Sequence, residues 1–402
     1  MAKKKRIKLN DQQLMLDASR VADIYHQMTI DLFDQVIDRI KERGTASLED
    51  NPYIWQLEKM SEMGLLNKDN IKLIAEYSGV AEEQLRYVIE NEGYKVYKDT
   101  KSQLLEALGG NGDFITNNLI QTNLANYVNQ TMGDINNLIN TTLPVSVRKV
   151  YQSIVEETVA KVITGLAAPE KAISSTVIKW AEKGFYGFTD KGGKQWRADT
   201  YARTVINSTS WRVYREARMA PAKELGIDTF YYSMKPAARE MCAPIQHQIV
   251  TFGETRVEEG EKIYSLLDYG YGSAGGCLGT NCHHTLTPYV VGVNYKPDLP
   301  EHLANLTPEE AIENANKQSK QRAIERSIRQ SKEMLHVANK LEDEELINKY
   351  KGQVKSRQAA MRAYLSQNPF LHRDYSRERY YSDPLREAKA EIKLRKDRKM
   401  VI

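Results

Sequence analysis

The stretch DYGYGSAGGCLGTNCHH at residues 268–284, together with MCAPIQH at residues 241–247, decides how this chain folds. These two stretches contain every cysteine of the 402-residue chain and three of its seven histidines: Cys242, Cys277, Cys282, His247, His283 and His284. The residues before and after them follow the spacing of long helices. The two stretches therefore predict a small, compact nucleus inserted in a helical chain.

The glycines of the longer stretch predict a tightly folded loop. Glycine adopts positive φ and lets backbone segments approach closely because it has no Cβ atom. The cluster has no lysine and no Gly-x-x-x-x-Gly-Lys pattern, so it does not match a phosphate-binding loop. We expect a structural motif made of Gly270, Gly272, Gly275, Gly276 and Asn281.

Three runs rich in β-branched and aromatic residues surround this loop, at 229–233, 248–252 and 284–293. They predict strands on either side of the two cysteine-containing stretches. We therefore expect a compact α+β domain over residues 227–296.

The remaining residues predict helices and one hairpin. Apolar residues recur at three-and-four spacing from 11 to 43, and Pro144 and Pro169 are placed to begin helices. We expect Gly64 to end a helix that begins at Pro52, and Ser78-Gly79 to separate two shorter helices. The expected elements are helices at 68–77, 80–92, 113–140, 144–166, 169–183, 197–224 and 376–400, and a hairpin near 184–196 with its turn at Asp190–Gly193.

The fold class predicted by this pattern is mainly α with a small α+β domain, in which long helical arms surround the Cys/His/Gly-rich nucleus. The glycine-rich run at 109–112 suggests a further boundary. Four segments are expected: an N-terminal helical region (1–110), a second helical region with the hairpin (111–226), the α+β domain (227–296), and a basic, charged helical tail (297–402).

The clustered cysteines and histidines suit a tetrahedral zinc ion. An extended chain after Cys282 places Cys282 and His284 on one face and His283 on the other. The candidate metal site is therefore Cys242, Cys282 and His284, with His247 or Cys277 as the fourth ligand. No Cys-x2-Cys knuckle is present. The alternative is that the cysteines are small buried hydrophobic residues and the histidines bridge backbone groups.

A nucleophilic enzyme is a second alternative, with Cys242 or Cys282 activated by a neighbouring histidine. No flanking sequence typical of such an enzyme is present. No catalytic residue is therefore assigned.

Basic side chains gather at both ends of the chain, although the net charge is only +4 at pH 7. Near the C-terminus they are interleaved with tyrosines, a pattern that favours a polyanionic partner such as nucleic acid. The alternative is a solvated helix face with paired charges. The candidate nucleic-acid contacts are Arg386, Lys393, Arg395, Lys396, Arg398 and Lys399.

No apolar run approaches the roughly 18 residues needed to span a bilayer. The N-terminus lacks the apolar core of a secretory signal. An odd number of cysteines without such a signal favours synthesis in a reducing cytoplasm.

Several motifs in order along the chain resemble the minor capsid protein 2 family of tailed phages that infect Gram-positive bacteria. That family is distantly similar to the F-type head-morphogenesis proteins of phage Mu. The motifs are RTVIN (203–207), ELG (224–226), AREMCAPIQ (238–246), GYGSAGG (270–276), NCHH (281–284), QRAIERSIR (321–329) and RDYSRE (373–378). Where the family has histidine, glycine and arginine, this chain has Ile245, His247 and His283, so an acid/base role at the position of Ile245 is removed.

The resemblance implies a minor structural protein of the phage head without enzymatic activity, present in a few copies in each virion. It implies action near the portal in head assembly or in DNA packaging and delivery. The implied partners are the portal and major capsid proteins and packaged double-stranded DNA, with assembly in the host cytoplasm. The alternative is a nuclease or transferase-like effector domain at 227–296, dependent on zinc and carried in the virion.

Overall fold

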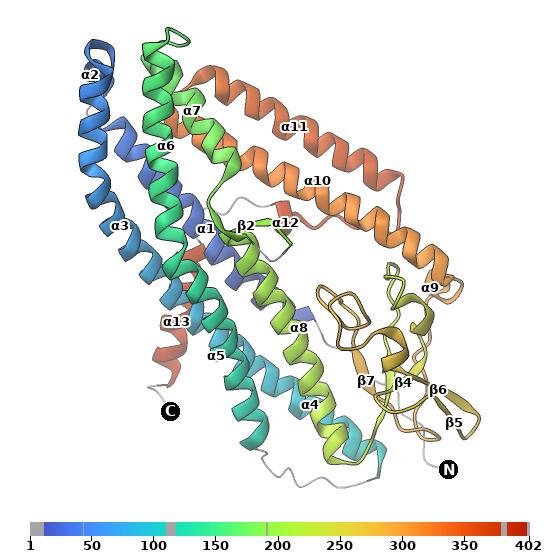
Figure 1. Cartoon of the computed structure of the whole chain (residues 1–402). Helices are drawn as coiled ribbons and strands as arrows, with labels where there is room; N and C mark the ends of the chain where they lie inside the picture. Colours follow the sequence, from blue (N-terminus) through green and yellow to red (C-terminus); the bar gives the residue numbers. More distant parts are fainter. Residues whose placement is uncertain (1–11, 43, 110–117, 190–191, 379–383, 400–402) are drawn as a thin grey trace. The chain divides into compact units, whose positions relative to one another are not determined.

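The structure is a computed structural model that describes residues 12–42, 44–109, 118–189, 192–378 and 384–399 (Figure 1). Most of these residues are helical, and the strands are short. This confirms the expected fold class, mainly α with a small α+β region. Among the described residues, no helix combines the length and apolar composition that crossing a membrane requires.

The chain divides into two compact units. The first contains residues up to Arg20, Gln84–Thr131 and Thr204–Lys320, and the second contains Val21–Glu83, Met132–Arg203 and the residues from Gln321 onward. Every boundary between them falls inside a helix. The four segments expected from the sequence are each continuous, whereas each of these units combines three separate stretches of the chain. The four-segment division stays a prediction.

The first unit contains a five-stranded mixed sheet. Its strands are β3 (Thr229–Tyr232), β4 (Ile249–Thr251), β5 (Arg256–Glu258), β6 (Glu261–Ser265) and β7 (Leu286–Pro288), in the order β5-β6-β4-β3-β7. Strand β3 is antiparallel to both β4 and β7, while β4 and β6 are parallel. The sequence predicted β3, β4 and β7 but missed the β5–β6 hairpin, whose residues are mostly polar.

Strand β3 is central and is buried on both faces, which explains its continuous run of large residues. Phe230 and Tyr232 pack on one face, in the hydrophobic cluster that also contains the three cysteines. Tyr231 packs on the other face, against Ile249 and neighbouring residues. Because side chains alternate along a strand, the two faces of the sheet at β3 have two separate hydrophobic clusters.

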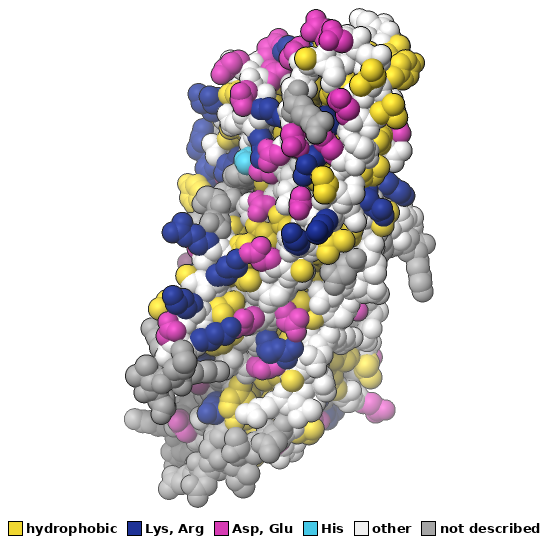
Figure 2. Space-filling view, turned by 90° about the vertical axis from the view of Figure 1, so that its left-hand side faces the viewer, with side chains coloured by type: hydrophobic (Ala, Val, Ile, Leu, Met, Phe, Trp, Pro, Cys, Tyr) yellow, Lys and Arg dark blue, Asp and Glu magenta, His cyan; other side chains and the backbone are white. Residues whose placement is uncertain are grey.

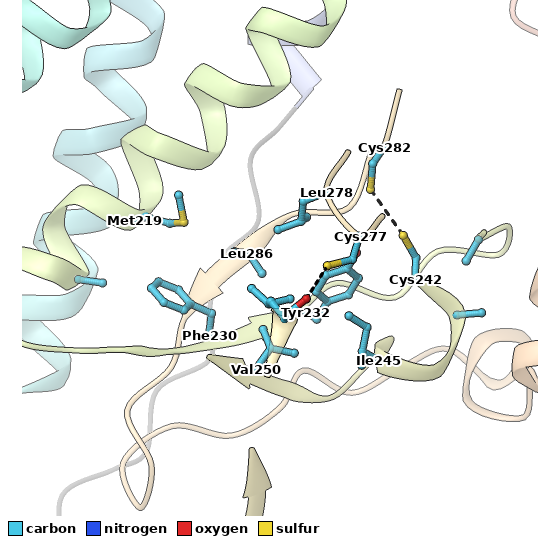
Figure 3. Close-up of a cluster of buried hydrophobic side chains, with 14 of the residues drawn as sticks. Met219, Phe230, Tyr232, Cys242, Ile245, Val250, Cys277, Leu278, Cys282 and Leu286 are labelled. Carbon is cyan, nitrogen blue, oxygen red and sulfur yellow. Dashed lines mark hydrogen bonds between the residues drawn. The ribbon is translucent and has the colours of Figure 1, made fainter. Parts of the chain in front are cut away.

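Helices and short turns complete the first unit. The cysteine-containing cluster receives Met219 from α8, Leu104 from α4 and Ala311 from α10 (Figure 3). The elements are α4 (Gly93–Ala107), the first part of α5 (Asn118–Thr141), most of α8 (Ala198–Glu224), α9 (Glu301–Ala304), the start of α10 (Pro308–Leu341), and the 3-10 turns η2 (Ala243–Ile245) and η3 (Leu266–Tyr269).

The second unit is helical apart from one hairpin. Strands β1 (Tyr186–Thr189) and β2 (Gln195–Arg197) pair antiparallel, which confirms the expected hairpin; Asp190 and Lys191 of its expected turn lie outside the described residues. The helices are most of α1 (Gln12–Lys41), α2 (Ala46–Asp50), most of α3 (Pro52–Tyr87), α6 (Leu143–Ile163), α7 (Pro169–Lys183), the remainder of α10, α11 (Glu344–Ser366), α12 (Tyr375–Glu378) and α13 (Pro384–Lys399).

Two helix predictions were wrong. Helix α3 continues through Gly64 and Gly79 and passes into a π-helical segment, η1 (Val88–Glu92). A glycine inside a helix costs about 1 kcal/mol, and burial of side chains such as Trp55 and Tyr77 on one face of α3 outweighs that cost. The predicted helix 376–400 is two helices, α12 and α13, with residues 379–383 outside the description. Pro384 begins α13, because proline fits the first turn of a helix and not its interior.

Candidate metal centre

Three of the predicted ligands meet in the first unit. The Sγ atoms of Cys242 and Cys282 lie 3.8 Å apart (Figure 3), and Cys282 Sγ lies 3.4 Å from His284 Nδ1. One ligand atom from each of the three residues lies within 4.8 Å of the others. All three side chains are buried.

Local backbone structure positions the two cysteines. Cys242 immediately precedes η2, where Pro244 fits the first turn, and the Cys242 amide donates to Arg239 O at 2.8 Å. The Cys282 amide donates to Gly279 O at 3.0 Å, at the end of the glycine-rich loop. Cys282 is therefore held by the fold of that loop.

The loop has the features that its glycines predict. Gly270, Gly272 and Asn281 all have positive φ, and a Cβ at Gly276 would overlap the carbonyl oxygen of Gly270. Gly275 differs, because a Cβ there would have no neighbour within 4 Å. The backbone segments of the loop therefore approach each other most closely at Gly276 and Gly270.

The tautomer of His284 follows from its hydrogen bonds. Gln246 Oε1 accepts the backbone N–H of Lys235 at 2.7 Å, so this atom is an acceptor and the amide orientation is fixed. His284 Nε2 lies 2.8 Å from the same oxygen and must therefore carry the proton and donate. Nδ1 then faces Cys282, either as an N–H donor or with a lone pair available to a metal. Metal-ligating histidines typically donate the N–H of their other ring nitrogen to an acceptor of this kind.

The two cysteine sulfurs share one hydrogen bond, which separates their pKa values. The hydrogen bond with Cys242 lowers the pKa of Cys282 far below its ordinary value, with a further contribution from His284. The same contact, together with burial, raises the pKa of Cys242. The pair therefore favours a thiolate at Cys282, which is the form that binds metal.

Two further groups surround the cluster. Arg215 on α8 donates from Nη1 to the carbonyl oxygen of Cys282 at 3.4 Å. Tyr232 on β3 packs its ring against His284, with ring centroids 4.9 Å apart. Burial raises the pKa of Tyr232, as do the nearby sulfurs of Cys282 and Cys242. Its hydroxyl is buried, with only a weak sulfur contact to Cys242.

The structure does not bring the other predicted ligands to this cluster. His247 has positive φ, and its Nδ1 lies 3.0 Å from the hydroxyl of Tyr231, on the opposite face of the sheet. Cys277 donates from Sγ to Leu266 O at 3.5 Å, and burial raises its pKa to about 12. His283 stacks on Trp211 of α8, with ring centroids 5.0 Å apart.

Sequence reasoning missed Gln246 and Tyr232, the two polar residues closest to the three ligands. Gln246 stands in the quoted stretch MCAPIQH, but its role depends on its distance from His284, which spacing does not reveal. The position of Tyr232 could have been predicted, because side chains alternate along β3 and Tyr232 therefore lies on the face opposite Tyr231.

The three side chains are better suited to binding a metal ion than to catalysing a reaction. Cys282 is 4% exposed, so a substrate has no path to its Sγ atom in this conformation. Two sulfurs and one imidazole are a typical zinc donor set. The fold and this site thus define a mainly helical protein with a buried Cys/His centre.

Comparison with known proteins identifies the family to which the chain is similar. Residues 9–366 match the family model described as phage minor capsid protein 2. A protein called "Structural protein" from Lactococcus phage LL-H is 31% identical over 370 residues, which is 89% of this chain and 98% of that protein. A second "Structural protein", from Lactococcus phage mv4, is 36% identical over 118 residues, 29% of this chain and 92% of that protein. No solved structure matches.

The chain belongs to the phage minor capsid protein 2 family, as its motifs suggested. Its relatives are structural proteins of phages, so this protein is a component of the virion.

Proposed function

We propose that this protein acts near the portal of the phage head, in head assembly and in the packaging and delivery of DNA. A minor capsid protein is present in few copies, whereas the shell lattice repeats one site many times. The portal vertex offers the small number of sites that such a component needs. The portal and major capsid proteins are its proposed partners.

The observation that carries this proposal is an exposed apolar face on α3. Five large side chains lie on one face of this helix, opposite its buried face, and each is at least half exposed: Tyr53, Ile54, Leu57, Leu65 and Ile71. An apolar face of this kind on a helix marks a surface that binds another protein. In the virion, that protein is a neighbouring head component.

The basic helix α13 supports a contact with packaged DNA. Charged residues of both signs are intermixed on the face shown in Figure 2, so no large basic patch covers it. Within α13, Lys389 and Lys396 form ion pairs with Glu76 and Glu83 of α3. Lys393 is exposed and lies between these two lysines on the same side of the helix. Two other predicted contacts, Arg398 and Lys399, have side chains outside the description.

The zinc-dependent nuclease or transferase-like effector remains the alternative function. It requires a substrate to reach Cys282 or Cys242, and both side chains are buried. The geometry therefore favours the architectural role.

The test is a phage whose gene for this protein is deleted and then complemented. We expect the wild-type protein in few copies at the portal vertex, located by cryo-electron microscopy of labelled heads and counted by quantitative mass spectrometry. Leu57→Lys should reduce its incorporation, while Leu166→Lys, a matched change at an exposed residue in a loop, should not. Copies spread over the shell lattice, or normal heads and DNA delivery without the protein, would overturn the proposal.

A further inference from the structure

We propose that Cys242, Cys282 and His284 bind one zinc ion, which fastens the segment around η2 to the loop that precedes β7. This inference concerns how the first unit is held together and does not depend on the proposed role in the phage head.

Two of the three separations between the ligand atoms match those at a zinc ion, and all three atoms lie within 4.8 Å of one another. A tetrahedral ion with Zn–S bonds of about 2.3 Å and a Zn–N bond of about 2.0 Å separates two sulfurs by about 3.8 Å and a sulfur from a nitrogen by about 3.5 Å. The observed separations are 3.8 Å between Cys242 Sγ and Cys282 Sγ and 3.4 Å between Cys282 Sγ and His284 Nδ1. A disulfide requires sulfurs about 2.0 Å apart, so the arrangement matches a metal better than a covalent bridge.

The hydrogen bonds around His284 prepare it to bind a cation. Gln246 Oε1 fixes the proton on Nε2, which leaves Nδ1 directed toward Cys282 Sγ. Gln246 is itself held by the backbone N–H of Lys235. The imidazole is therefore oriented by a group that is itself fixed by the backbone, as in many metal sites.

The fourth position is assigned to an oxygen atom at Tyr232. Its side chain is fully buried, and its hydroxyl lies beside Cys242 and Cys282 with only a weak sulfur contact to Cys242. A thiol is a weak hydrogen-bond partner, and a metal ion or a metal-bound water supplies a stronger one. Tyr232 thus completes the site, either directly or through one water molecule.

The burial of the site assigns the ion a structural role. The two cysteines are 40 positions apart, and one lies beside η2 while the other ends the glycine-rich loop. The loop also contributes Cys277 and Leu278 to the hydrophobic core, and the ion would tie its last residue, Cys282, directly to Cys242. A metal that joins these segments stabilises the folded state by the free energy of binding.

The experiment is metal analysis of the full-length protein purified under reducing conditions. We expect one zinc per chain by elemental analysis, and a strong visible absorption of tetrahedral thiolate ligation when cobalt replaces zinc. Chelation should lower the melting temperature of the wild-type protein. Cys242→Ser, Cys282→Ser and His284→Ala should each lose the zinc, and Tyr232→Phe should alter the cobalt spectrum.

Cys277→Ser is the matched control, because Cys277 is buried in the same hydrophobic core but is hydrogen-bonded to Leu266 O and is not one of the three ligands. It should keep its zinc and its cobalt spectrum. If the ligand variants do not fold, the wild-type zinc content and cobalt spectrum still decide the question. A wild-type protein without metal whose melting temperature is unchanged by chelator would overturn the proposal. So would a Cys242–Cys282 disulfide, or the same zinc loss in Cys277→Ser.

Discussion

The ammonium group of Lys59 on α3 caps the C-terminus of α1 by donating to Arg39 O at 2.8 Å and, in the same way, to Glu42 O at 2.7 Å. The last carbonyl groups of a helix have no partner inside the helix and carry the negative end of its dipole. Lys59 is 1% exposed, and Glu62 lies 3.7 Å from its Nζ atom. A single buried cation therefore joins the end of α1 to the N-terminal part of α3.

Replacing Lys59 with methionine should destabilise the second unit. Methionine keeps the length and apolar stem but leaves two buried carbonyl oxygens and Glu62 without their partner, a loss of about 2–4 kcal/mol. Urea unfolding followed by far-ultraviolet circular dichroism measures this change. Lys68→Met on the exposed side of the same helix is the control and should stay within about 0.5 kcal/mol of the wild type. Equal effects of the two substitutions would show that the cap contributes nothing.

The glycine-rich loop allows a comparison of adjacent residues. Gly276→Ala places a methyl group on the carbonyl oxygen of Gly270, and backbone cannot move aside as a flexible side chain does. We expect a loss of stability of about 3 kcal/mol or more from this overlap. Gly275→Ala should be nearly neutral, because a Cβ there has no neighbour within 4 Å. Thermal melting of the two variants tests this, and similar melting temperatures would contradict the loop geometry.

The sequence predicted most helices because periodicity and proline positions are local signals. It failed at Gly64 and Gly79 because the packing that outweighs a helical glycine comes from residues distant in sequence. It missed β5 and β6 because both strands are short and mostly polar, and β5 is an exposed edge strand. In β6 only Ile263 is a buried apolar residue, so the alternation of apolar and polar residues that signals a strand is weak.

A second buried charge network lies near the start of α8. His26 Nδ1 lies 3.0 Å from Asp199 Oδ2, and Arg197 Nε donates to Asp199 Oδ1 at 3.2 Å. Glu333 on α10 lies 3.3 Å from His26 Nε2 and 3.6 Å from Arg197 Nη2. Burial raises the pKa of Asp199, but the charge of Arg197 and the hydrogen bond with His26 outweigh it, so the pKa lies well below its usual range.

Asp199→Asn should destabilise the protein by about 3 kcal/mol at neutral pH, because it removes the carboxylate that pairs with the guanidinium of Arg197 at 3.2 Å. A carboxylate with a lowered folded-state pKa contributes its full stability above its unfolded pKa, about 3.9, and loses it as the pH falls through the folded pKa. The difference between wild type and variant should therefore be constant from pH 7 to pH 5 and shrink below about pH 4. Denaturant unfolding across this range checks it, and a difference that changes between pH 5 and pH 7 would contradict the assignment to Asp199.

For the metal centre, spacing identified three residues that the structure brings together but also proposed His247. The error has a backbone cause, because His247 has a φ of 59° and its side chain turns toward Tyr231. A left-handed backbone of this kind suits glycine better than histidine. A residue type suited to metal therefore occupies a position whose backbone directs it away from the other ligands.

Exposed Lys393 on α13 allows the proposed DNA contact to be tested separately from net charge. Retention of the full-length protein on double-stranded DNA should fall steeply with salt, because each neutralised phosphate releases condensed counterions. Lys393→Glu should weaken retention at low salt and reduce the logarithmic salt slope by about 1. Lys351→Glu makes the same charge change at an exposed residue of α11 and should leave the slope unchanged. Retention that does not depend on salt, or equal effects of the two variants, would mean that α13 does not form the DNA contact.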